Sequence, residues 1–377
     1  YFVLLSVIII VGLSFYYIYK EGKPSLKNNL LVLLLFLIPS FVLYKQCFVR
    51  ADESHIREFF FVFPLIIFSS TNILEKLNNR ISVFLMFLVL GISVYFVNEL
   101  NPSAFSSIDK IDKSEYLSGL RNFTPTSSFK LFPNDNKMPQ KIKNYIQQSS
   151  VDAYPWYSQM LLENKLNFTP RPVFQSYTAY TPELEELNFD HYNSDQAPKY
   201  VIYDYLGIDN RYPLFDEPKL NLLLAKNYTC KDTFELNARK YLVLEKTSNK
   251  KIKFIQTSEY AMNIHSPLIP KQNTYYKVFL YRNLMGNIVS LATHSPEVSL
   301  EIKCKDGTVR NHKTSKPLLE SGLFSTNLVE DINDFSNLMN ESGHIKKSIS
   351  AYYFVAEDFS LFKDKISAPV FTYKARN

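Results

Sequence analysis

The sequence contains few of the residues that build disulfide frameworks or metal sites. There are three cysteines among 377 residues, namely Cys47, Cys230 and Cys304. An odd and sparse set provides neither a disulfide framework nor the ligand spacing of a metal site. The six histidines are scattered, and none forms an HxxxH or HxH pair. We therefore predict no metal site and see no evident cofactor, but a divalent metal and a Cys230–Cys304 pairing outside the cytoplasm are left open.

Glycine is also scarce, with nine residues in all, and no glycine-rich phosphate loop occurs. The backbone needs such a loop to approach a pyrophosphate closely, so a dinucleotide site is not expected. The formal net charge of +6 is spread along the chain without a block of like charge. Nucleic-acid binding would need a basic stripe or a recognition motif, so it is not expected either.

The first hundred residues, in contrast, are rich in long apolar runs. These lie at roughly 2–19, 30–44, 59–74 and 81–97. A membrane span needs about 20 apolar residues, with about 17 as the lower limit, so the second and third runs are short but fit a packed bundle. We therefore expect a membrane α-helical bundle of about four spans at residues 1–98, with the lipid bilayer as its partner.

Charges between the runs predict the orientation of this bundle. A lysine-rich loop follows the first run, and Lys76 and Arg80 follow the third. Because basic loops tend to stay in the cytoplasm, the rest of the chain is assigned to the opposite, extracytoplasmic side. Tyr1 already lies within an apolar run. We interpret the chain as the C-terminal part of a larger membrane protein.

A polar stretch, RADESHIRE at residues 50–58, separates the second and third runs. Ionisable groups close to a membrane are costly and often functional, and arginine binds phosphate through paired hydrogen bonds. Two interpretations are open: a solvated turn whose charges neutralise one another, or a polar site for a lipid pyrophosphate. The candidate residues of this membrane-interface site are Arg50, Asp52, His55 and Arg57.

Residues 99–249 alternate between short apolar strands and amphipathic helices, which predicts an α/β domain with a parallel sheet. The strands are expected at 129–132, 151–154, 172–175, 200–203 and 241–244, and the helices at 138–148, 158–165, 182–192 and 218–227. Thr181 is a good N-cap, and Pro182 falls at the first helical position. Ligands of open α/β sheets bind beyond the carboxyl ends of the strands.

Polar and aromatic side chains follow the predicted strands repeatedly at those ends. They define a candidate ligand groove of Asp152, Trp156, Arg171, Gln175, Tyr177, Tyr180, Asp204, Asp209 and Arg211. Aromatic faces combined with carboxylates and amides suit the recognition of a polyol or sugar. Structural roles compete with this one: Trp156 as a plug of the sheet end, Asp204 and Asp209 as turn formers. Arg171 could likewise pair with Glu183 or Asp152.

From residue 250 the segments YYKVFLY, EVSLEIKC and SISAYYFVAE are β-branched and aromatic. The step Lys305–Asp306–Gly307 is typical of a hairpin turn. We predict a C-terminal β-sandwich, jelly-roll-like, at residues 250–377.

Several motifs also carry a resemblance. The runs VDAYPW, LNFTPRPVFQSYTAYTPELEELN, APKYVIYD and GIDNRYPLFDEP resemble a group of uncharacterised multi-spanning bacterial envelope proteins, as do FVRADESHIREFF and SGLFSTNLVEDINDF. The resemblance spans about residues 48–335. In layout the group is similar to the GT-C type of membrane glycosyltransferases, which use a polyprenyl-phosphate sugar donor. Those enzymes place a catalytic carboxylate in an early extracytoplasmic loop, so the resemblance implies a base upstream of Tyr1.

Two functions follow from these observations. The first is hexosyl transfer from a polyprenyl-phosphate-linked sugar to a glycan acceptor in cell-envelope assembly, by a multi-pass protein of the bacterial cytoplasmic membrane. Arg50, Asp52 and His55 would then lie near the donor. The alternative is a non-catalytic, membrane-anchored protein that binds a glycan or a partner, or acts as a scaffold. The layout likeness is one of fold alone and does not decide between them.

Overall fold

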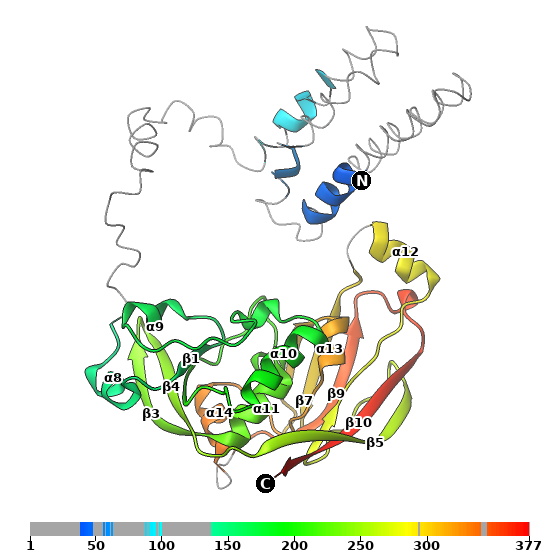
Figure 1. The fold of residues 1–377 in the computed structure, drawn as a ribbon. Helices are drawn as coiled ribbons and strands as arrows, with labels where there is room; N and C mark the ends of the chain where they lie inside the picture. Colours follow the sequence, from blue (N-terminus) through cyan, green and yellow to red (C-terminus); the bar gives the residue numbers. More distant parts are fainter. Residues whose placement is uncertain are drawn as a thin grey trace, which may run out of the picture. The chain divides into compact units, whose positions relative to one another are not determined.

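The computed structural model describes residues 38–47, 56, 58–60, 62, 87–88, 90–95, 97, 99, 137–292, 295–340 and 345–376 (Figure 1). The chain divides into two compact units. One comprises Tyr1–Ser128 and Val289–Ser295, and the other Phe129–Ile288 and Pro296–Asn377. The second unit contains the sheets and the candidate ligand groove.

The predicted four-span membrane bundle is contradicted in the part of the chain that the structure describes. None of the helices there is long and apolar enough to cross a membrane. The same finding contradicts the predicted multi-pass location in the bacterial cytoplasmic membrane. Most of the four apolar runs lies outside the described residues.

The α/β part of the second unit is built on a four-stranded sheet of order β1-β2-β4-β3. The strands are β1 (Val151–Tyr154), β2 (Tyr200–Tyr203), β3 (Tyr228–Leu236) and β4 (Arg239–Lys246). β1 and β2 pair in parallel, and the other two pairs are antiparallel. The prediction of a parallel sheet is therefore wrong for two of the three strand pairs.

A tight hairpin explains why β3 and β4 are antiparallel. Leu236 pairs with Arg239, and the two residues between them, Asn237 and Ala238, both have positive φ angles, of 51° and 59°. That backbone is typical of the two-residue turns that match the twist of a hairpin. The predicted strand at 172–175 does not form, and the one at 129–132 lies outside the described residues.

The helices of this part follow the predicted positions. They are α8 (Gln140–Ile146), α9 (Gln159–Glu163), α10 (Pro182–Tyr192) and α11 (Pro218–Asn227). Thr181 caps α10 by accepting a hydrogen bond from the backbone amide of Leu184 at 3.4 Å, with Pro182 at the first helical position. α10 thus begins where its capping and proline signals indicate, and α11 begins at Pro218 without a side-chain cap.

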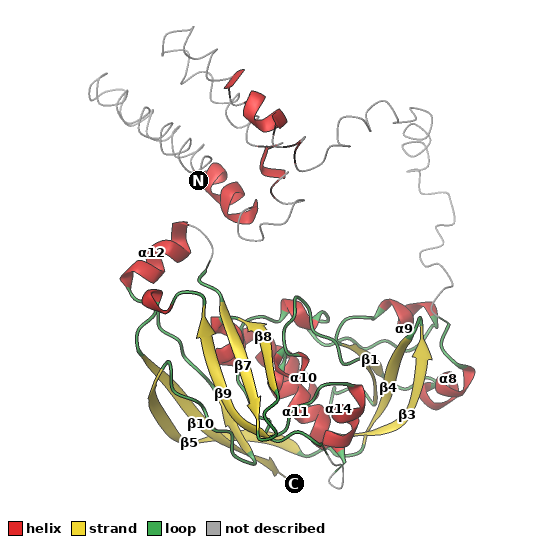
Figure 2. Cartoon of the chain, turned by 180° about the vertical axis from the view of Figure 1, so that it is seen from behind, coloured by secondary structure: helices red, strands yellow, loops and turns green. Residues whose placement is uncertain are grey.

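The C-terminal part contains two three-stranded antiparallel sheets (Figure 2). The first sheet, of order β5-β10-β6, comprises β5 (Lys251–Asn263), β10 (Lys365–Arg376) and β6 (Thr274–Tyr276). The second sheet, of order β8-β7-β9, comprises β8 (Val309–Thr314), β7 (Val298–Cys304) and β9 (Ile349–Ala356). Along the chain, α12 (Leu284–Ala292) lies between β6 and β7, and α13 (Lys316–Ser321) and α14 (Ile332–Met339) lie between β8 and β9. A jelly roll has eight strands, so the described residues do not form one. The predicted hairpin turn at Lys305–Gly307 joins β7 to β8, with Gly307 at a φ of 88°.

One hydrophobic core joins the two parts of this unit. It includes Tyr203 and Leu223 from the α/β part and Tyr275, Phe335 and Tyr352 from the C-terminal part. A second, smaller cluster packs α8 and α9 against the other face of the sheet. All residues of β1 and β2 are buried, as expected for a sheet covered on both faces. The predicted boundary at residue 250 therefore falls within a continuous core.

Candidate functional site

The predicted groove lies where β1 and β2 end. The backbone amide of Asp204 donates to the carbonyl of Tyr154 at 2.8 Å, so the two strands leave the sheet side by side. The amide of Ser176 donates to the carbonyl of Pro155 at 3.1 Å and brings the segment 170–188 to the same edge. The structure thus places three of the predicted turns together, and they form an inner and an outer layer.

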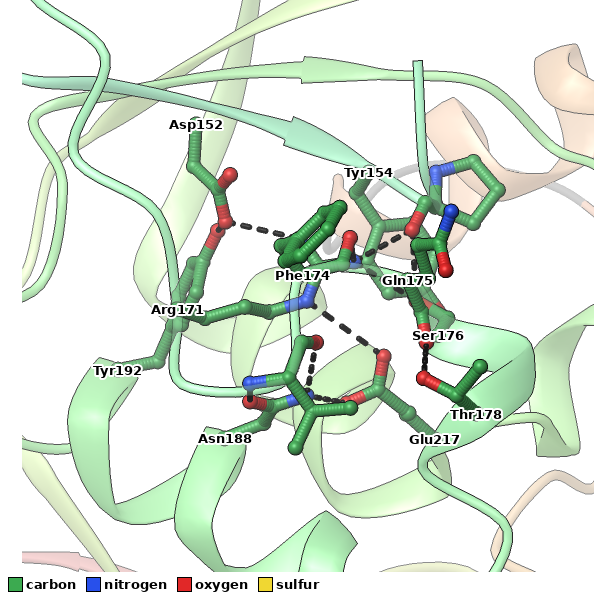
Figure 3. A network of polar contacts seen from close by, with 12 residues as sticks. Asp152, Tyr154, Arg171, Phe174, Gln175, Ser176, Thr178, Asn188, Tyr192 and Glu217 are labelled. Carbon is green, nitrogen blue, oxygen red and sulfur yellow. Dashed lines mark hydrogen bonds and ion pairs between the residues drawn. The ribbon is translucent and has the colours of Figure 1, made fainter. Parts of the chain in front are cut away.

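Arg171 forms the centre of the inner layer (Figure 3). Its side chain is 0% exposed. Nη1 donates to Oδ2 of Asp152 at 2.8 Å and to the carbonyl of Ala153 at 2.9 Å. Nη2 donates to the carbonyls of Pro155 at 2.5 Å and Phe174 at 3.0 Å, and to Oγ of Ser176 at 2.9 Å. The guanidinium therefore joins the end of β1 to the turn at 174–176.

Two further carboxylate contacts complete this layer. Oδ2 of Asp152 also accepts a hydrogen bond from the Tyr192 hydroxyl at 2.7 Å. Nε of Arg171 lies 3.7 Å from Oε2 of Glu217, whose Oε1 accepts from Nδ2 of Asn188 at 2.6 Å. Burial raises the pKa of Glu217, and Arg171 opposes this shift. We call Asp152, Arg171, Asn188, Tyr192 and Glu217 the buried arginine network.

Two stacked aromatic rings, those of Tyr154 and Tyr203, pack against this network. The guanidinium carbon of Arg171 lies 5.2 Å from the centre of the Tyr154 ring, which stacks on Tyr203 at 5.0 Å. Asn221 donates to the Tyr154 hydroxyl and accepts from that of Tyr203. Because Arg171 and Asp152 are enclosed, their role is to fix the turn. Of the two carboxylates that the sequence offered to Arg171, the partner is Asp152, and Glu183 is exposed at the start of α10.

The outer layer is aromatic and partly exposed. The Trp156 ring lies 5.4 Å from that of Tyr177 in an edge-to-face arrangement and 5.8 Å from that of Tyr157. The guanidinium of Arg239 lies over Tyr157, 4.9 Å from the ring centre, and donates to its hydroxyl. Arg239 is also 3.8 Å from Oδ2 of Asp204. We call these five residues the aromatic surface.

Asp204 is the unusual member of the aromatic surface. It is 8% exposed, and its Oδ2 has no hydrogen-bond partner among the described residues. Burial raises the pKa of Asp204, whereas the charge of Arg239 opposes this shift. The Asp204 side chain is 11% exposed, and a carboxylate that is paired with an arginine beside aromatic rings is suited to accept a hydrogen bond from a bound hydroxyl group.

The remaining predicted groove residues differ in their placement. Gln175 is half-buried beside Ser176, and its side chain bonds to no other described residue. Tyr180 is 54% exposed. Asp209 lies in an exposed turn with a φ of 52°, and Arg211 pairs with Asp216 at 3.6 Å and bridges to Lys313 of β8. Arg211 thus belongs with the C-terminal part and not with the aromatic surface.

Sequence reasoning missed two members of the aromatic surface, Tyr157 and Arg239. Arg239 reaches it because the unpredicted β3–β4 hairpin starts β4 beyond the end of β2. Tyr157 lies next to Trp156, and only its contact with Arg239 distinguishes it from a packing residue. The predicted membrane-interface residues Arg50, Asp52, His55 and Arg57 lie outside the described residues.

Within the described residues, no group of three His, Cys, Asp or Glu side chains is arranged to hold a metal ion. Cys230 and Cys304 are both free thiols. Comparisons of the chain with protein-family models, with curated proteins and with solved structures found no match. The assignment of function therefore depends on the chemistry of the site.

Proposed function

We propose that the protein binds a glycan at the aromatic surface. The observation that carries this proposal is the pairing of the nearly buried Asp204 with Arg239, whose guanidinium also lies over Tyr157, next to the Trp156–Tyr177 ring pair. Sugar rings present apolar C–H faces and a rim of hydroxyl groups. Aromatic rings bind the former, and charged or amide groups bind the latter.

Each member of the aromatic surface has a distinct role in this proposal. Trp156 and Tyr177 supply large, rigid apolar faces with a small loss of conformational entropy. Asp204 accepts a hydrogen bond from a sugar hydroxyl, and Arg239 orients Asp204 and Tyr157. The buried arginine network positions Gln175 and Tyr177 by fixing the backbone at Phe174 and Ser176.

The single tryptophan of the chain provides a direct test. Because Trp156 is the only tryptophan, its fluorescence reports on this surface alone. Titration of the full chain with cellohexaose, chitohexaose and maltohexaose should give a saturable change with at least one of them. Binding measured by calorimetry should weaken at least about tenfold in Trp156→Ala and in Tyr177→Ala, a loss of about 1.4 kcal/mol.

Tyr281→Ala is the matched control, because Tyr281 is 42% exposed and its ring contacts no other described aromatic ring. This variant should bind as the wild type does. Asp204→Asn keeps the shape of the site and should weaken binding less than Trp156→Ala does. The absence of a saturable signal with all three glycans, or equal affinity of wild type and Trp156→Ala, would rule the proposal out.

Hexosyl transfer from a lipid-linked donor stays a prediction. The residues assigned to its donor site, Arg50, Asp52 and His55, lie outside the described residues. The aromatic surface would serve such an enzyme as its acceptor site, so the binding experiment applies to both functions.

A further inference from the structure

A cavity lies at the end of the four-stranded sheet opposite to the aromatic surface. α11 begins beyond the carboxyl end of β2 and ends at Asn227, whose carbonyl accepts from the amide of Thr247 at 2.9 Å. β4 leads directly to Thr247 and pairs Glu245 with Tyr200, the first residue of β2. The end of α11 is therefore at the amino end of β2, away from the aromatic surface. The cavity there has a volume of about 580 Å³.

Two helix ends, two loops and a strand line this cavity. α11 contributes Ala225 and Lys226, and α14 contributes Asn337 and Leu338. Further lining comes from the loop at 324–327, the turn at Gln272–Asn273, Ile345, and Tyr373 of β10. The volume falls within the range of about 300–1,000 Å³ that is usual for small-molecule sites.

The wall is rich in amide groups. Five amide side chains line the cavity, those of Gln272, Asn273, Asn327, Asn337 and Asn340. Phe324 and Leu222 supply an apolar floor. Among the described residues that line it, the only charged side chain is that of Lys226, and none is a carboxylate. We call this the amide cavity.

Several of these polar groups are not used within the protein. Asn327 accepts from Ser348 at 3.3 Å, and Asn273 from Tyr373 at 3.4 Å. The side chains of Gln272, Asn337 and Thr326 bond to no other described residue. Each amide offers two donors and an acceptor, so the cavity presents many hydrogen-bonding groups around an apolar floor.

Among the residues that the structure describes, the helix ends and Lys226 set the charge preference of this cavity. Residues of the last turns of α11 and α14 line it, and the carboxyl ends of helices carry a partial negative charge. They disfavour phosphate and carboxylate groups, while Lys226 disfavours a cation. A neutral molecule with many hydroxyl or amide groups avoids both penalties and uses the free amides.

We infer that the amide cavity is a second binding site, which takes a neutral, hydroxyl-bearing ligand of the size of one or two sugar units. The residues involved are separate from the aromatic surface, so this inference holds whether or not the aromatic surface binds a glycan. A chain with both sites would contact two separate ligands, or two distant parts of one.

Saturation-transfer NMR on the full chain tests this inference with four probes: glucose, N-acetylglucosamine, chitobiose and inorganic phosphate. We expect saturable binding of at least one neutral sugar in the wild type and in Trp156→Ala. In Gln272→Ala/Asn337→Ala the affinity should fall at least about tenfold. Asn311→Ala is the matched control, because Asn311 is an exposed asparagine of β8 that does not line the cavity, and it should bind normally.

The single variant Gln272→Ala separates a loss of binding from a folding defect. Gln272 is exposed and lies outside the helices and strands, so its removal should not affect folding. It should weaken binding by a smaller factor and leave the thermal midpoint unchanged. Three results would overturn the inference: no neutral sugar bound up to its solubility limit, phosphate bound in preference to the sugars, or sugar binding lost in Trp156→Ala but retained in the cavity variants.

Discussion

The segment from Pro170 to Asn188 has one side that faces the buried arginine network and one that faces the aromatic surface. On the buried side, both Nη groups of Arg171 are fully engaged, and Asn188 bonds to the backbone of Val173. On the outer side, Gln175 bonds to no other described residue through its side chain, and Tyr177 meets Trp156 only by an edge. Buried polar groups that bond to one another hold the chain in place, whereas exposed ones with free capacity can bind a ligand. Substitutions on the two sides should therefore have different consequences.

Removal of Arg171 should have the largest effect. Arg171→Leu leaves Asp152 and Glu217 buried without their cation, and the loss of one partner of a buried pair costs about 3–5 kcal/mol. Urea denaturation of the full chain would measure this change. Arg310→Leu is the control, because Arg310 pairs with Glu330 at an exposed position and should cost at most about 1 kcal/mol. Equal losses in the two variants would contradict a central role for Arg171.

Glu185, on the buried side of the same segment, should make stability depend on pH. Burial raises its pKa from 4.5 to about 7. Between these values the unfolded carboxyl releases its proton and the folded one keeps it, so stability falls as the pH rises through this window and then levels off. The change is up to about 3 kcal/mol. Glu185→Gln should flatten this part of the profile, measured as the thermal midpoint against pH.

The exposed neighbour Glu183 is the control for this profile. A hydrogen bond from its own backbone amide lowers its pKa, so its contribution has the opposite sign. Glu183→Gln should therefore keep the fall in stability. Burial also raises the pKa of Asp216 to about 7, so Asp216 lowers stability with rising pH as Glu185 does. Both variants keep this contribution. A wild-type midpoint that does not decline across the window would contradict the assignment.

These differences also show what the sequence could predict. β1, β2, α10 and α11 were predicted within their bounds, because buried apolar runs and capping residues such as Thr181 are local signals. β3 was missed because it alternates between buried and exposed residues and reads YTCKDTFEL, with charges in its middle. Its turn, Asn237–Ala238, lacks the glycine by which such hairpins are recognised.

The candidate site was predictable to the same extent. The sequence placed Trp156 and Asp204 shortly after β1 and β2, and the pairing of Arg171 with Asp152 was one of its two alternatives. The strand predicted before Gln175 and Tyr177 does not form. It could not predict Glu217 and Asn188, because their contact depends on how α10 packs against α11. Contacts between elements distant in the chain depend on tertiary packing, for which a single sequence has no local signal.

Asn188 should have an intermediate effect. Its side chain donates to the carbonyl of Val173 and to Glu217 and accepts from the amide of Val173. Asn188→Ala leaves these buried groups without partners, at a cost of about 1–3 kcal/mol. Denaturation would measure the loss, and hydrogen exchange at the Val173 amide should become faster. Leu187→Ala, at an exposed position of the same helix, should change neither quantity.

Gln175 should have the smallest effect on stability and a measurable one on binding. Its side chain bonds to no other described residue, so Gln175→Ala should change the free energy of unfolding by no more than about 0.5 kcal/mol. If Gln175 bonds to a glycan hydroxyl, the variant loses about 0.5–1.5 kcal/mol of binding, or about two- to tenfold in affinity. Calorimetry with the glycan that binds the wild type would measure this. If the variant loses stability but not affinity, Gln175 has a structural role like that of the buried residues. Glycan binding would then depend on Trp156, Tyr177 and Asp204 alone.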